Sequence, residues 1–216
     1  MNDDKTPLRV KLRGAKVKIC GIRSLEAALV AVDAGADFLG FNFVPTSKRY
    51  IDPSVAKTII EAVKDKVQVV GVFQDVDKET IREICSLLSL DFVQLHGKET
   101  PAFCREIKTP VIKAFALASD FDYEVISGMF GSYDIAYYLI DRHVQGAGEQ
   151  LAVDRVKPLG NMFPLFVAGG LTVDNVGQVV SEVQPFAVDV AGGIETDGKE
   201  DHQKIKDFVK KAKGKI

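Results

Sequence analysis

Two apolar runs in the last third of the chain end in paired glycines, a combination that can bind phosphate. The runs are Phe166–Gly170 and Val188–Gly193, and they lie one strand-helix-strand unit apart. A strand that stops in Gly-Gly can leave its backbone N–H groups open to an anion, because no Cβ blocks the approach. Each pair alone is equally consistent with an ordinary turn. Two pairs at corresponding positions favour one phosphate site, and its candidate residues are Gly169, Gly170, Ala191, Gly192 and Gly193.

Polar side chains that could act as acids, bases or ligands also lie at the ends of apolar runs. They are Cys20, Asn42, Arg49, Asp75, His96, Asp141 and Asp189. A free thiol titrates near about 8.5 and must lose its proton to act as a base. A free carboxyl titrates near about 3.9 and must hold a proton to act as an acid. Cys20 and Asp141 are therefore candidates for opposite roles in proton transfer. In a ring of strands the two groups could face each other across a pocket. The plainer interpretations are a buried strand cysteine and a carboxylate that caps a helix or pairs in a loop.

Eight short apolar runs predict the strands that would position these groups. Most runs are continuously apolar, as at 67–73, which suits parallel strands covered by helices. The predicted strands are 17–22, 38–44, 67–73, 92–96, 111–117, 135–140, 164–168 and 187–191. Helical patterns lie between them and begin at Ser24, at Asp52-Pro53 and at 172–175. The segment 120–130 has the weakest helical pattern.

The regular alternation of strands and helices predicts an α/β fold, a single (β/α)8 TIM barrel with eight parallel strands. An open doubly wound sheet is the alternative, but the first strand lacks the G-x-G-x-x-G pattern that such sheets use to bind dinucleotides. In a barrel, reactive groups lie at the carboxyl ends of the strands, and phosphate often binds at the last two. We expect residues 17–216 to form one catalytic domain and residues 1–16 an N-terminal extension.

Composition narrows the class of protein. The 216 residues include 28 basic and 30 acidic side chains, for a formal net charge of −2, so we expect no nucleic-acid partner. No apolar stretch is long enough to span a membrane and residues 1–16 are polar, so we expect no membrane association and a cytoplasmic location. The three cysteines lack a metal-site spacing, so we expect no metal. Cys85 and Cys104 are interpreted as small core residues of helices.

Four segments together resemble the phosphoribosylanthranilate isomerase family of tryptophan biosynthesis. They are Val17–Ile22, Ser47–Ile51, Val93–Gly97 and Asp189–Glu195, and each lies at the end of a predicted strand or in the loop after it. The resemblance runs from about residue 17 to the C-terminus. It implies a TIM barrel, a small phosphoribosyl substrate, no cofactor and an Amadori rearrangement. In that reaction N-(5-phosphoribosyl)anthranilate opens its ribose ring and becomes 1-(2-carboxyphenylamino)-1-deoxyribulose 5-phosphate.

The resemblance also implies roles for single residues. By this resemblance Cys20, in a Lys-x-Cys-Gly segment, is the general base and Asp141 is the general acid. Arg49 matches the arginine that meets the anthranilate carboxylate, a role suited to a guanidinium with bidentate donors. We expect His96 to line the pocket and Asp189 to orient the backbone before the phosphate loop. The protein is expected to be a monomer or a homodimer.

Two segments depart from the family pattern. Residues 145–149 read Gln-Gly-Ala-Gly-Glu where the family usually has Gly-Gly-Ser/Thr-Gly-Lys. Residues 191–193 read Ala-Gly-Gly where Ser-Ser-Gly is common, so phosphate must rely on backbone donors there. Two other functions stay open: another phosphosugar isomerase or epimerase barrel, and a non-catalytic phosphosugar-binding module. The first needs other catalytic groups, such as metal ligands or a pair of aspartates.

Overall fold

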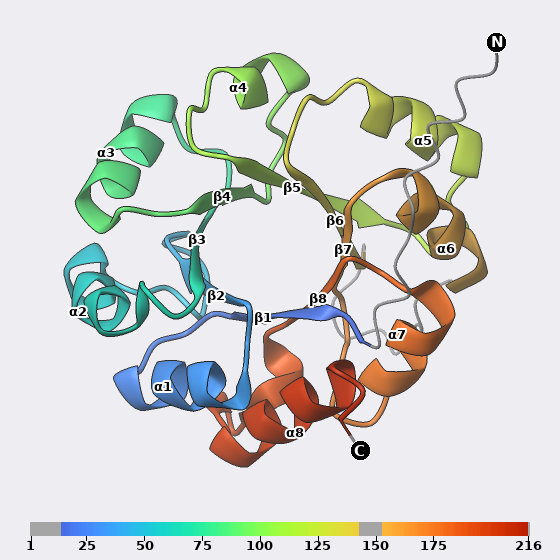
Figure 1. Ribbon diagram of the computed structural model, residues 1–216. Coiled ribbons are helices and arrows are strands. Elements are labelled where there is room, and N and C mark those ends of the chain that lie inside the picture. Colours follow the sequence, from blue (N-terminus) through green and yellow to red (C-terminus); the bar gives the residue numbers. More distant parts are fainter. Residues whose placement is uncertain (1–13, 143–152, 216) are drawn as a thin grey trace, which may run out of the picture.

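Eight parallel strands close into a barrel, and the helices between them form an outer ring (Figure 1). The structure is a computed structural model that describes residues 14–142 and 153–215. The strands are β1 (Lys16–Cys20), β2 (Phe38–Asn42), β3 (Gln68–Phe73), β4 (Phe92–Leu95), β5 (Val111–Leu117), β6 (Tyr137–Arg142), β7 (Leu165–Val167) and β8 (Ala187–Val190). Each strand pairs with its neighbours in chain order, and β8 pairs with β1. The predicted (β/α)8 TIM barrel is confirmed.

The outer helices begin where the sequence provides capping side chains. They are α1 (Leu25–Ala34), α2 (Pro53–Val63), α3 (Lys78–Leu88), α4 (Pro101–Arg105), α5 (Tyr123–Gly131), α6 (Val153–Met162), α7 (Val176–Val183) and α8 (His202–Ala212). Ser24 and Asp122 each accept a hydrogen bond from a backbone N–H in the following first turn. A helix therefore forms at α5, where the sequence pattern is weakest. Before α7, Asn175 Oδ1 accepts instead from the N–H of Thr172 and does not cap the helix, which begins at Val176, directly after the predicted start at 172–175.

Aromatic side chains fill the barrel at the amino-terminal ends of its strands. Phe166 is fully buried, and its ring centroid lies 5.2 Å from Phe38, 5.3 Å from Tyr137 and 5.7 Å from Phe186. Val70, Ile112 and Leu139 belong to the same buried cluster. The barrel interior is thus a packed core at this end, and its polar groups lie nearer the carboxyl ends of the strands.

A second core lies between the strands and the helices. Successive strand side chains point to opposite faces, so residues next to the interior ones face outward. Ile19, Leu39 and Ile140 are examples, and they are buried in one cluster with Phe208 of α8. Burial on both faces explains why the strands read as continuous apolar runs in the sequence.

Some predictions on the chain's organisation lie partly outside the described residues. Residues 1–13 and 143–152 are not described, so the extension at 1–16 and the consequences of the altered segment 145–149 stay predictions. β1 begins at Lys16. Within the described part of the chain, no helix combines the length and apolar character needed to cross a membrane.

We expect Phe166→Ala to lower the free energy of unfolding by about 3–5 kcal/mol, because it empties a packed aromatic site. Urea titration followed by circular dichroism measures this change. Val125→Ala is the control, since that α5 side chain is 66% exposed and its truncation should change the free energy by less than about 0.5 kcal/mol. A loss at Phe166 no larger than at Val125 would contradict this account of the core.

Candidate active site

A buried ion pair lies beside the thiol at the end of β1. Lys18 and Cys20 alternate along β1 and therefore face the barrel interior together. Lys18 is fully buried, and its Nζ donates to Oδ1 of Asp189 on β8 at 2.9 Å. The Cys20 side chain, which is partly exposed, lies close to the same ammonium, and the charge of Lys18 favours its thiolate. Asp189 therefore has a lysine partner that the sequence analysis did not predict, and its expected role in orienting the backbone stays a prediction.

Gly40 on β2 leaves the space that this group needs. It is the register partner of Cys20 across the β1–β2 pair. A Cβ at Gly40 would lie 2.8 Å from Cys20 Sγ and 3.0 Å from Lys18 Nζ. Both atoms therefore lie against the same bare backbone position, and a larger residue would force them apart.

Burial and neighbouring charges have competing effects on the pKa values of Cys20 and Lys18. Burial raises the pKa of the Cys20 thiol, Lys18 and Arg49 lower it, and Asp189 raises it, which leaves the pKa above its ordinary value. Burial lowers the pKa of Lys18, but Asp189 and Cys20 together outweigh that effect and the pKa is raised. The pair with Asp189 thus favours the ammonium form of Lys18, and the Cys20 thiol loses its proton less readily than a free thiol does.

Asp141 ends on the same side of the barrel, beside His96. Its Oδ2 lies 3.4 Å from Nε2 of His96, which follows β4. The Nδ1 of His96 meets the side-chain amide of Gln94 at 3.2 Å, so the ring is held from both sides. Asp189 interacts electrostatically with Asp141 and His96 as well as with Lys18. Through Asp189 the groups on β1, β4, β6 and β8 form one electrostatic cluster.

Arg49, in the loop after β2, reaches the loop after β8. Its Nε and Nη2 donate to the two carboxylate oxygens of Glu195 at 2.8 and 2.7 Å. Arg23, in the loop after β1, lies 3.6 Å from Glu195 and 3.4 Å from Glu200. Burial acts to raise the pKa of Glu195, but hydrogen bonds and charge from Arg49 hold it below its ordinary value. Glu195 therefore ties three loops together as a carboxylate.

The glycine segments after β7 and β8 contact each other. Gly169 and Gly170 have φ angles of 81° and 73°, in the left-handed region that favours glycine. A Cβ on Gly193 would lie 1.9 Å from the carbonyl oxygen of Leu171, so a side chain there is incompatible with this approach. Gly192 begins a short 3-10 helix, η1 (Gly192–Ile194). The two segments are neighbours, and phosphate binding between them stays a prediction.

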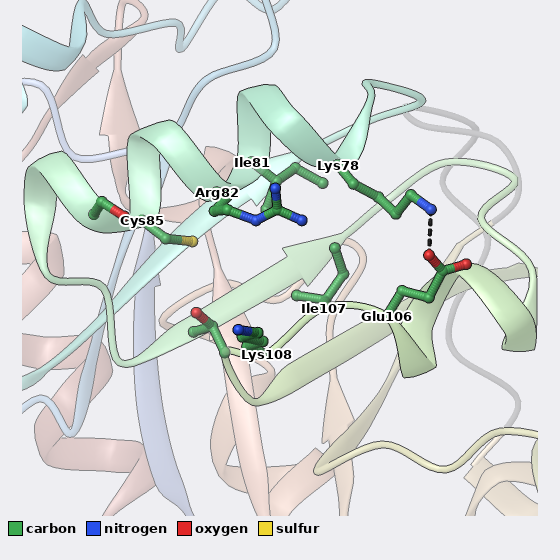
Figure 2. Close-up of a pocket in the computed structure, with 9 residues that line it drawn as sticks. Lys78, Ile81, Arg82, Cys85, Glu106, Ile107 and Lys108 are labelled. Carbon is green, nitrogen blue, oxygen red and sulfur yellow. Dashed lines mark hydrogen bonds and ion pairs between the residues drawn. The ribbon is translucent and has the colours of Figure 1, made fainter.

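A separate cavity of about 230 Å³ lies outside the barrel, between α3 and the segment 106–109. Figure 2 shows Lys78 of α3 pointing toward Glu106, with which it forms an ion pair. Cys85 lines the same cavity. None of the residues proposed from the sequence for the site lines it, so the candidate active site is not this cavity.

The structure brings some of the sequence-predicted residues into direct contact. His96 meets Asp141, and a Cβ on Gly192 would lie 3.1 Å from Nη2 of Arg49. Sequence reasoning assigned no role to Lys18, Gly40, Gln94 or Glu195. The signal for Lys18 was a lone charge in an apolar run, two residues before Cys20 and hence on the same strand face.

A closed parallel barrel whose polar groups gather at the carboxyl ends of its strands defines a TIM-barrel enzyme. The chain matches the family model of N-(5'-phosphoribosyl)anthranilate (PRA) isomerase over residues 17–211. It is 42% identical over 203 residues to the N-(5'-phosphoribosyl)anthranilate isomerase of Geobacter sp. (strain M21), covering 92% of this chain and 98% of that protein. The chain belongs to the N-(5'-phosphoribosyl)anthranilate isomerase family and is an isomerase, as the resemblance indicated.

Solved structures agree with this membership. The phosphoribosyl anthranilate isomerase of Thermotoga maritima superposes with a TM-score of 0.85 at 40% identity, covering 93% of this chain and 99% of that one. A phosphoribosyl anthranilate isomerase in complex with reduced 1-(o-carboxyphenylamino)-1-deoxyribulose 5-phosphate gives a TM-score of 0.82 at 39% identity, with the same coverage. Another structure of the Thermotoga maritima isomerase shows monomers generated from this enzyme, which is described as dimeric.

Metal-ligating side chains do not cluster in the part of the chain that the structure describes. No group of three or more His, Cys, Asp or Glu residues there could hold an ion.

We expect Gly40→Ala to lower the free energy of unfolding by about 1–3 kcal/mol, since the new methyl group must displace Cys20 Sγ or Lys18 Nζ. Chemical denaturation measures the loss. In the control, Gly128→Ala on α5, the Cβ meets nothing within 4 Å. That change should stabilise the helix by up to about 1 kcal/mol. Equal effects of the two substitutions would show that Gly40 is not tightly packed.

Proposed function

We propose that this chain converts N-(5-phosphoribosyl)anthranilate into 1-(2-carboxyphenylamino)-1-deoxyribulose 5-phosphate by an Amadori rearrangement. The observation that carries the proposal is the family match over residues 17–211, with a thiol and a carboxyl at the ends of β1 and β6. A relative at 39% identity binds a reduced form of the proposed product, which supports the same ligand class here. The reaction belongs to tryptophan biosynthesis.

Cys20 is the general base and Asp141 the general acid in this proposal. Asp141 donates a proton to the ring oxygen of the furanose, the bond between that oxygen and the anomeric carbon breaks, and the anthranilate nitrogen forms an iminium. The Cys20 thiolate then removes the proton from the adjacent carbon, and the resulting enolamine becomes the ketone. His96, 3.4 Å from Asp141, lines the site and orients that carboxyl. The nitrogen supplies the electron sink, so the mechanism uses no cofactor.

Arg49 binds the anthranilate carboxylate in this proposal. Two of its five N–H donors already meet Glu195, which leaves the edge formed by Nη1 and the second N–H of Nη2 for the substrate. A guanidinium fixed in this way presents a defined edge to a planar carboxylate. Glu195 thereby fixes the direction from which the anthranilate ring is held.

The phosphate binds between the loops after β7 and β8. Gly169, Gly170, Ala191, Gly192 and Gly193 supply this site, through backbone N–H groups that no bulky side chain covers. The contact between Gly193 and Leu171 supports the proposal because it joins the two loops into one surface. A phosphate held there leaves the sugar to extend toward β1 and β6.

We propose that residues 17–216 form one catalytic domain and residues 1–16 an extension. The family match begins at residue 17, and the strands from β1 to β8 form a single barrel. The cytoplasmic location and the monomeric or homodimeric state stay predictions.

Cys20→Ala and Asp141→Asn should each lower kcat by about 10²–10⁴-fold, the usual contribution of a general base or acid. Turnover is followed by the fluorescence of phosphoribosylanthranilate generated in place and its disappearance on addition of the protein. Cys85→Ala and Asp65→Asn are matched controls away from the strand ends and should retain turnover. Wild-type turnover in either site variant refutes that residue's role, and wild-type protein that binds without conversion favours the non-catalytic module.

Gly192→Val should raise KM and the inhibition constant of inorganic phosphate together, because its side chain obstructs the phosphate loops. Competitive inhibition by phosphate measures the effect. Since a Cβ there also approaches Arg49, Arg49→Lys is tested in parallel and should raise KM while leaving phosphate inhibition unchanged. Gly177→Ala, whose Cβ meets nothing within 4 Å, is the control for substitution of a glycine. Unchanged phosphate inhibition in Gly192→Val would place the phosphate elsewhere.

A further inference from the structure

We propose that Lys18 is a positioning residue for Cys20, and that its ammonium, anchored by Asp189, holds the ionised thiol in place during proton abstraction. The inference rests on the proposed function of Cys20 as the base. It adds the group that stabilises the thiolate form of Cys20. Lys18 does not touch the substrate in this proposal. It acts through Cys20.

Lys18 has a hydrogen-bond partner on β8 and a neighbouring thiol on its own strand. An ammonium has three donors and no acceptor, so each of its contacts must be with an acceptor. One donor meets the carboxylate of Asp189 at 2.9 Å, and Cys20 Sγ lies close to the same ammonium at the Gly40 position. Asp189 holds the lysine from the neighbouring strand, which leaves two donors for other acceptors.

The bare backbone of Gly40 indicates that this contact is built into the fold. A Cβ at that position would meet Cys20 Sγ at 2.8 Å and Lys18 Nζ at 3.0 Å, so a single gap accommodates both atoms. A lysine that served only to neutralise Asp189 would not need the thiol in the same gap. The shared gap therefore favours a role for Lys18 in positioning Cys20 over a role in a purely structural ion pair.

The charges around Cys20 come from several elements, and they have different signs. Lys18 on β1 and Arg49 after β2 favour the thiolate, whereas burial and Asp189 on β8 oppose it. His96 and Asp141 face Asp189 from β4 and β6. Because Lys18 favours the thiolate and Asp189 opposes it, removing the charge of the lysine should raise the pKa of the thiol, and removing the charge of the carboxylate should lower it.

The experiment follows alkylation of Cys20 by iodoacetamide from pH 6 to 10, with each cysteine read by peptide mass spectrometry. Only the thiolate reacts, so the midpoint of the rate profile reports the pKa of Cys20. Asp189→Asn retains an acceptor for Lys18 but removes the negative charge, and it should lower the midpoint. The double variant Lys18→Met/Asp189→Asn leaves no unpaired buried charge. Its midpoint should lie at least one pH unit above that of Asp189→Asn, a tenfold difference in thiolate-to-thiol ratio.

Cys85 in the same digests is the internal control, and its midpoint should be the same in all variants. Equal Cys20 midpoints in Asp189→Asn and the double variant would overturn the proposal, because the lysine would then have no effect on the thiol. The pH profile of kcat/KM in the same variants should shift in the same direction as the alkylation midpoints. Midpoints that shift while Cys20→Ala keeps full turnover would support the coupling of Lys18 to Cys20 and refute only the assignment of Cys20 as the base.

Discussion

The ion pair between Lys18 and Asp189 lies where the first and last strands close the barrel. The two residues are register partners across the β1–β8 seam, and their side chains meet inside it. A buried charge without a partner is costly, so this seam is stable only when both strands are in register. The same pair approaches Cys20 on one side and, through Asp189, the His96–Asp141 contact on the other. The closing seam of the barrel and the candidate active site therefore share one interaction.

The barrel itself could be predicted because its strands are buried on both faces. That burial produces continuous apolar runs, which are visible without any knowledge of the partners. The start of α7 was harder to predict, since Asn175 bonds back to Thr172 instead of capping the helix. Side chains of this kind have several local partners available, and only the folded backbone decides among them.

The residues that surround the predicted site were not predictable in the same way. Lys18 binds Asp189 at a sequence separation of 171, and Arg49 binds Glu195 at a separation of 146. No local pattern contains such pairs, because they are created only when the barrel closes. The lysine partner of Asp189 could not be predicted for this reason: in the sequence Asp189 stands beside a glycine loop, whereas in space it faces a lysine from the other end of the chain.

The contact between Gly193 and Leu171 limits the substitutions that the loops after β7 and β8 can accept. With 1.9 Å between a hypothetical Cβ and the carbonyl oxygen, the two loops cannot vary independently. Any side chain acquired at Gly193 requires the neighbouring loop to move, and a moved loop requires a new shape at η1. The shape of one loop therefore limits the substitutions that the other can accept.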